Sequence, residues 1–159
     1  KAKEGMGSVD GIKSFTEYKN GVFNTTIDLN ADVLKYATQE YILVTMYHEF
    51  IHAYLSYQVS TLPYDQYTAK FPKVSEYEVK DSNGNIIKKY ALIKDHKNYG
   101  SFIESLKNSI ISFNPVITSS YAEALAKNGI VESLTENESK INRNERDTRN
   151  NEYKGKKCP

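Results

Sequence analysis

The stretch TQEYILVTMYHEFIHAYLSYQV, from Thr38 to Val59, decides the fold of this chain of 159 residues. It contains neither proline nor glycine, and its apolar residues recur at helical spacing, which predicts a long amphipathic helix. We expect a short helix from Val33 before it, with Thr38 opening the long one. The buried side is predicted to carry apolar residues three or four apart, namely Leu43, Tyr47, Phe50, Tyr54 and Tyr57.

Four further patterns outside this helix predict the remaining elements. A period of two predicts a half-buried strand, apolar runs on either side of Asn83-Gly84 predict a hairpin, and helical spacing returns twice. These elements cover residues 22–29, residues 74–93, residues 95–112 and a stretch that begins near Ser119 or Ser120. We therefore expect an α+β fold in which a small sheet with a hairpin packs on the long helix, together with two or three further helices.

Length and composition place these elements in one domain, residues 1–159. The segments of about 1–20 and 140–159 lack a sustained apolar period, and we expect them to be flexible. The chain begins at Lys1 without a methionine or an apolar leader. This favours a processed or excised product that is exported or secreted, with the cytoplasm as the alternative.

The charge balance and the lack of long apolar runs bear on the partners of the chain. The 21 basic and 20 acidic residues leave a formal net charge of +1, so no overall field attracts nucleic acid. No apolar run is long enough to span a membrane. Cys158 is the single cysteine and cannot form a disulfide within the chain. Neither nucleic acid nor a membrane is therefore predicted as a partner.

The long helix carries the segment His48-Glu49-Phe50-Ile51-His52. Residues four apart lie on the same helix face, so His48 and His52 can bind one zinc ion through their imidazoles. Glu49 lies beside them, where its carboxylate can accept a proton from a water molecule that zinc activates. Because the chain holds only three histidines, this spacing is improbable by chance. The segment predicts one zinc ion per chain, with Glu49 as general base.

A catalytic zinc normally has three protein ligands and one water. His96 is the only other histidine and lies at the start of the helix predicted after the hairpin, so we expect it to be the third ligand. Asp95, Glu104 and Glu123 are the alternatives, and any of them would make a His-His-carboxylate site. The absence of a glycine and a third histidine shortly after His52 excludes the extended metzincin pattern.

Attack on a carbonyl also needs a donor for the oxyanion that forms. Tyr99 and Tyr121 are the candidates for this role among 13 tyrosines. The strand at residues 22–29 is a candidate sheet edge for pairing with an extended substrate. Pairing through the main chain would give affinity without demanding a particular sequence.

The segment HEFIHAYL, His48 to Leu55, resembles the motif helix of SprT-like zinc metallopeptidases. The segment from Asp95 to Phe102 is similar to that family's later element, in which the histidine that opens a helix is the third zinc ligand. The segment from Ala122 to Ala126 is similar to the last helix of a Bacteroidetes-type branch of secreted or toxin-associated proteins. The resemblance covers about residues 22–130 and implies a zincin-like fold and peptidase chemistry.

Two features depart from the DNA-linked members of that family. Lys97 follows His96 where those members have glycine, and one cysteine cannot make their zinc ribbon. The resemblance therefore implies a zinc metallopeptidase that hydrolyses a protein or peptide substrate, and these departures do not favour the DNA-protein crosslink role of those members. The alternatives are a zinc hydrolase of a non-peptide amide, which the same residues would serve, and a catalytically idle zincin-fold binding or toxin module.

Overall fold

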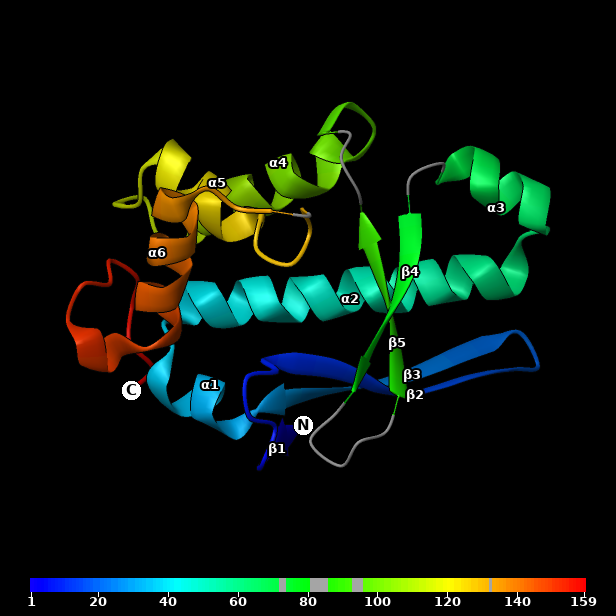
Figure 1. The fold of residues 1–159 in the computed structure, drawn as a ribbon, viewed down its shortest axis with the longest axis horizontal. Helices are drawn as coiled ribbons and strands as arrows, with labels where there is room; N and C mark the ends of the chain where they lie inside the picture. The colour runs from blue at the N-terminus through cyan, green and yellow to red at the C-terminus, as the bar shows by residue number, and fades with distance from the viewer. Residues whose placement is uncertain (72–73, 81–85, 93–95, 132) are drawn as a thin grey trace.

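The computed structural model describes residues 1–71, 74–80, 86–92, 96–131 and 133–159, with the backbone alone for Phe15 and for the described residues between 74 and 101. A three-stranded sheet and a separate hairpin accompany six α-helices in this part of the chain (Figure 1). The α+β class is therefore confirmed. The elements are β1 (Ala2–Lys3), β2 (Gly11–Lys19), β3 (Val22–Asn30), α1 (Ala31–Tyr36), α2 (Gln39–Thr61), α3 (Tyr64–Lys70), β4 (Val74–Lys80), β5 (Ile86–Leu92), α4 (His96–Phe113), α5 (Ser119–Ala126), α6 (Glu136–Arg146) and a 3-10 turn (Thr148–Asn150).

Helix α2 lies through the middle of the molecule, with the three-stranded sheet on one side and α4 and α5 on the other (Figure 1). The predicted break before it is confirmed, because Ala37 and Thr38 both have extended backbone. The Thr38 hydroxyl then accepts a hydrogen bond from the Tyr41 amide at 3.3 Å and caps the first turn of α2. The hairpin of β4 and β5 is antiparallel, and β5 contacts α2; the turn predicted at residues 81–85 lies outside the described residues.

The sheet has the order β1-β3-β2, so the strand predicted at residues 22–29 is central at its carboxyl end. The edge nearest to α2 belongs to β2, which the sequence analysis missed in a segment expected to be flexible. Apolar and polar residues do not alternate clearly along β2, because the face of this strand that points away from α2 is exposed to solvent. Asn20 and Gly21, both at positive φ, form the tight turn from β2 to β3 and were the available sequence signal.

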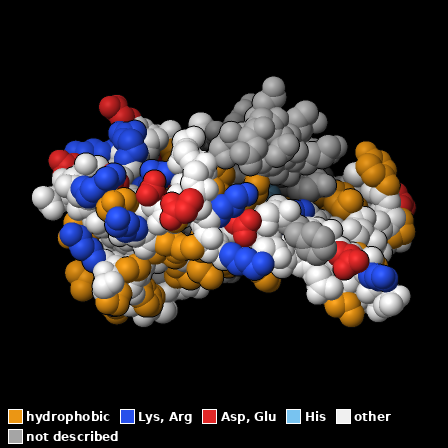
Figure 2. All heavy atoms as spheres, turned by 90° about the horizontal axis from the view of Figure 1, so that it is seen from below, with side chains coloured by type: hydrophobic (Ala, Val, Ile, Leu, Met, Phe, Trp, Pro, Cys, Tyr) orange, Lys and Arg blue, Asp and Glu red, His pale blue; other side chains and the backbone are white. Residues whose placement is uncertain are grey.

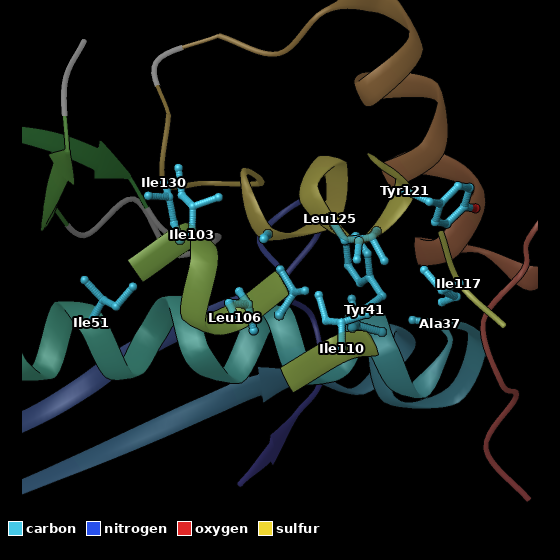
Figure 3. Close-up of a cluster of buried hydrophobic side chains, with 14 of the residues drawn as sticks. Ala37, Tyr41, Ile51, Ile103, Leu106, Ile110, Ile117, Tyr121, Leu125 and Ile130 are labelled. Atoms are coloured by element: carbon cyan, nitrogen blue, oxygen red, sulfur yellow. The ribbon is translucent and has the colours of Figure 1, made fainter. Parts of the chain in front are cut away.

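The main core lies between α2 and helices α4 and α5 (Figure 3). Leu55 of α2, Leu106 and Ile110 of α4, and Leu125 of α5 are all fully buried. The helical spacing that predicted α4 and α5 is confirmed by these buried residues, although Phe113 near the end of α4 is exposed. The capping residue of α5 is Thr118, one position before the predicted start.

The single buried stripe predicted for α2 is confirmed only in part, because Leu43, Tyr47 and Tyr54 are partly buried against the core and the other two residues are exposed. Phe50 is 63% exposed and Tyr57 37% exposed, whereas Tyr41, Val44 and Leu55 are buried. The sheet covers one side of α2 and the other helices cover another, so buried residues occur on more than one face. A single amphipathic stripe is expected only when one side of a helix is covered, and α2 is covered on more than one side.

The carboxyl-terminal segment also contains regular structure where the sequence analysis expected flexibility beyond residue 140. Helix α6 begins with a capping box made by Thr135 and Glu138. The fully buried Glu145 accepts hydrogen bonds from the backbone amides of Lys154 at 2.6 Å and Gly155 at 3.1 Å. The equally buried Glu40 of α2 accepts one from the amide of Lys156 at 2.7 Å. These two carboxylates hold the final residues against the start of α2.

The surface charge and the length of the helices bear on the predicted partners. Basic side chains are interspersed with acidic ones on the face seen in Figure 2, in keeping with the balanced net charge. Within the described ranges, no helix is both long enough and apolar enough to cross a membrane.

Replacement of Gly155 by alanine should destabilise the fold. A Cβ at this position would overlap the carboxylate oxygens of Glu40 and Glu145 and the side chain of Thr38. Overpacking of a well-packed site costs about 1–3 kcal/mol. We expect urea denaturation to show a loss of this size for Gly155→Ala, with no change for the exposed control Pro159→Ala. Equal stability of the two variants would contradict the anchoring of the final residues.

Candidate metal centre

His48 and His52 lie one turn apart on α2 and direct their rings toward each other. Their Nε2 atoms are 2.8 Å apart, and the ring planes meet at 82°. The carboxylate of Glu49 lies beside them, with its Oε1 atom 3.8 Å from Nε2 of His48. One potential ligand atom from each of the three residues lies within 4.8 Å of the others. The spacing predicted from the sequence is therefore present as a compact cluster.

The cluster is nearly removed from solvent. Glu49 is 2% exposed and His52 4% exposed, while the side chain of His48 keeps 15% of its surface accessible. A cavity of about 350 Å³ opens beside His48 and Glu49. Its walls come from the loop before β2, from α2 and from the loop after α5, and the lining residues are Ser8, Val9, Asp10, Gly11, Val44, Thr45, His48, Glu49, Asn128 and Gly129.

Two glycines allow backbone to approach the cluster closely. A Cβ at Gly11 would lie 2.9 Å from Cγ of Glu49, so the β2 backbone packs directly on this carboxylate side chain. A Cβ at Gly129 would lie 2.5 Å from Nδ1 of His48, and Gly129 also has a φ of +71°. The loop after α5 thus presses on the ring of His48, and only glycine suits its place.

A hydrogen-bond network joins the walls of the cavity. The Tyr41 hydroxyl donates to Oδ2 of Asp10 at 2.7 Å and accepts from Nδ2 of Asn128 at 3.2 Å. Nε of Arg146 donates to Oδ1 of Asp10 at 2.7 Å. Burial, together with the Asp10 charge, raises the pKa of Tyr41 well above its ordinary value, so the phenol stays protonated and can donate. The network links four segments distant in sequence, which no local pattern could reveal.

The donor set fits a zinc ion. Zinc binds imidazole nitrogen at about 2.0–2.1 Å, and two nitrogens on one tetrahedral zinc lie about 3.3 Å apart. The observed separation of 2.8 Å between the two Nε2 atoms needs only a small outward rotation of the rings to match. Two adjacent imidazoles and a carboxylate are costly to bury without a ligand or a partner that satisfies them.

The candidates for the third ligand separate into two groups. Glu104 is 58% exposed and binds Lys107 at 2.5 Å, and Glu123 is 43% exposed and binds Lys127 at 2.8 Å. Both carboxylates therefore pair with lysines on the protein surface. His96 is the first residue of α4, a helix that packs on α2, but its side chain lies outside the described residues, as does Asp95.

The two tyrosines predicted as oxyanion donors have different outcomes. The Tyr121 hydroxyl donates to Oε1 of Glu145 at 2.6 Å, and Glu145 in turn holds Thr38 at the start of α2. The structure therefore does not bring Tyr121 to His48 and His52, and the hydrogen bond to a buried carboxylate explains its placement. The side chain of Tyr99 lies outside the described residues.

A cationic side chain near the cluster was missed by the sequence analysis. Lys13 of β2 is partly buried, and its Nζ atom donates to Oγ of Ser56 on α2 at 2.5 Å. Desolvation lowers the pKa of Lys13, while the nearby charge of Glu49 acts in the opposite direction. Because β2 was not predicted as a strand, no sequence signal placed this lysine beside the motif helix.

Comparison with known proteins adds no assignment. No family model matches the chain, and neither a curated protein nor a solved structure shows significant similarity to it.

Replacement of Gly129 by alanine should weaken zinc binding. The added methyl group would displace the ring of His48, and loss of a group that orients a ligand typically costs about 10- to 100-fold in metal affinity. Gly5→Ala is the matched control, since Gly5 has the same φ of +71° with no atom within 4 Å of an added Cβ. Chelator competition should show the loss for Gly129→Ala alone. Equal loss in both variants would mean that backbone strain, not contact with His48, is responsible.

Substitution of His96 tests the third ligand. We expect His96→Ala to weaken zinc binding by more than about 100-fold, because loss of a ligand should exceed the loss of an orienting group. Glu104→Gln and Glu123→Gln should leave the zinc content unchanged, since both carboxylates bind surface lysines. Zinc content is measured on purified protein by elemental analysis. Undiminished zinc in His96→Ala would instead favour Asp95, to be tested with Asp95→Asn.

Proposed function

We propose that this protein is a zinc-dependent metallopeptidase that hydrolyses peptide bonds in a protein or peptide substrate. The observation that carries the proposal is the buried cluster on α2, in which two imidazole nitrogens lie 2.8 Å apart beside the carboxylate of Glu49. The resemblance of the motif helix to SprT-like zinc metallopeptidases supports the same activity. In this proposal, His48, His52 and His96 hold the ion.

Zinc, when bound, would acidify a water molecule to a pKa near 7 and polarise the substrate carbonyl. Glu49 would accept the proton of that water through its carboxylate and later donate it to the leaving amine nitrogen. A general base must reach the proton that it abstracts, and the position of Glu49 next to both histidines meets this need. The packing of Gly11 on the Glu49 side chain would keep the carboxylate in place during both transfers.

The edge strand β2 would hold an extended substrate along the cluster. Its inner face already contacts α2, and β2 pairs with β3 on one side only among the described strands. A substrate that adds to this edge would gain main-chain hydrogen bonds with little demand on its sequence. Residues 22–28 of β3, the edge proposed from the sequence, also have one side unpaired among the described strands, but β2 lies nearer to α2 and is the edge that we propose for the substrate.

Zinc analysis and one conservative substitution test this function. We expect purified wild-type protein to hold about one zinc per chain. Glu49→Gln should keep the metal and lower peptide hydrolysis by about 100-fold or more, since it removes only the proton acceptor. His48→Ala is the companion variant and should lose both the metal and the activity.

The possible outcomes separate the proposal from its rivals. Wild-type protein that binds no zinc would contradict the metal site and the peptidase together. Zinc binding with hydrolysis of simple amides but not of any peptide in a proteome-derived library would point to a non-peptide amide hydrolase. Zinc binding without any hydrolysis would favour a binding module that keeps the fold.

A further inference from the structure

Lys13 is a partly buried cation with an incomplete set of partners. Its ammonium group has three donors, and Oγ of Ser56, at 2.5 Å, accepts one of them. Among the described residues, no carboxylate lies within ion-pairing distance of Lys13, whereas Lys107, Lys127 and Lys140 each pair with a glutamate. Within the part of the chain that the structure describes, the other two donors of Lys13 thus have no acceptor.

The place of Lys13 in the fold brings its charge close enough to Glu49 of the candidate metal centre for the two to interact. Gly11 and Lys13 are two residues apart in the regular part of β2, before the bulge, and therefore share one face of the strand. Gly11 packs on Glu49, and the partner of Lys13, Ser56, lies one turn beyond His52 on α2. One turn of helix is about 5.4 Å along its axis, so Ser56, the residue that the ammonium contacts, lies about that far from His52 along α2.

The charge of this region explains why an anion would bind here. Desolvation makes the Lys13 ammonium less stable than in water, and the charge of Glu49 offsets this only in part. A carboxylate from a ligand would add a hydrogen-bonded counter-charge to the more distant charge of Glu49, and a charge-assisted hydrogen bond is strong in a partly buried setting. A lysine that served only to join β2 to α2 would gain nothing from such a ligand.

We propose that Lys13 forms an anionic subsite that selects substrates carrying a carboxylate next to the bond that is cut. The proposal rests on the peptidase function and specifies its substrate class. The carboxylate belongs either to an acidic side chain or to the free carboxyl terminus of the peptide. Both have the same chemistry at Lys13, and the experiment distinguishes them.

Matched peptide libraries provide the test. Three libraries have the same random core, one with Asp and Glu and a blocked terminus, one with Asn and Gln in their place and a blocked terminus, and one with Asn and Gln and a free terminus. For wild-type protein we expect kcat/KM to be about 10- to 100-fold higher on one of the two carboxylate libraries than on the uncharged library. The favoured library identifies the source of the carboxylate.

Substitutions then assign the preference to Lys13. Lys13→Met should abolish the preference by lowering the rate on the favoured library far more than on the uncharged library, with the change in KM and not in kcat. Lys13→Arg should retain the preference because it keeps the charge. Lys19→Met is the control, since Lys19 lies on the same strand but is exposed. Ser56→Ala removes the hydroxyl that accepts a hydrogen bond from Lys13 but leaves the charge of the lysine. It should therefore also retain the preference.

The outcomes that overturn the subsite differ from those that overturn the function. Cleavage of all libraries at equal rates by wild-type protein, or an unchanged preference in Lys13→Met, would refute the subsite and leave the peptidase intact. Equal losses on charged and uncharged libraries in Lys13→Met would show that Lys13 only joins β2 to α2. No cleavage of any library by zinc-loaded wild-type protein would refute the subsite and the peptidase together.

Discussion

Burial of α2 on two sides is the constraint on which the rest of the structure depends. The helix lies between the sheet and helices α4 and α5, so its polar residues cannot all face water. His52 and Glu49 are buried near its middle, and Glu40 is fully buried near its start. Buried ionisable groups are tolerated only when partners or ligands satisfy them. The need to satisfy such groups shapes the surrounding loops and the carboxyl-terminal segment.

The surroundings of Glu40 differ from those of His48 and Glu49. Around Glu40 the protein supplies its own donors, from Nδ2 of Asn114 at 2.7 Å and from the amide of Lys156 at 2.7 Å. Beside His48 and Glu49 the structure provides a cavity and close glycine backbone. A carboxylate surrounded by fixed amides is suited to hold a fold together. A cluster of imidazoles and a carboxylate beside a cavity is suited to hold an ion and act on a ligand.

The cavity walls come from parts of the chain that are far apart in sequence. Asp10 of the amino-terminal loop receives hydrogen bonds from Tyr41 of α2 and Arg146 of α6, and Asn128 joins the same network. These bonds fix the positions of the loops that contact Glu49 and His48. The stability of the fold and the shape of the candidate site therefore rest on shared interactions.

Local spacing in the sequence determined the motif helix, the break at Thr38, the pairing of His48 with His52 and the α+β class, because helix and strand periods depend on near neighbours alone. Tertiary structure decided the rest. It placed β2 at the sheet edge, turned Tyr121 toward Glu145, directed Glu104 and Glu123 to surface lysines and brought Lys13 to Ser56, 43 residues away in the chain. Such contacts depend on which elements pack together. The packing that forms is the one that lowers the free energy of the whole chain, so it cannot be read from any one segment.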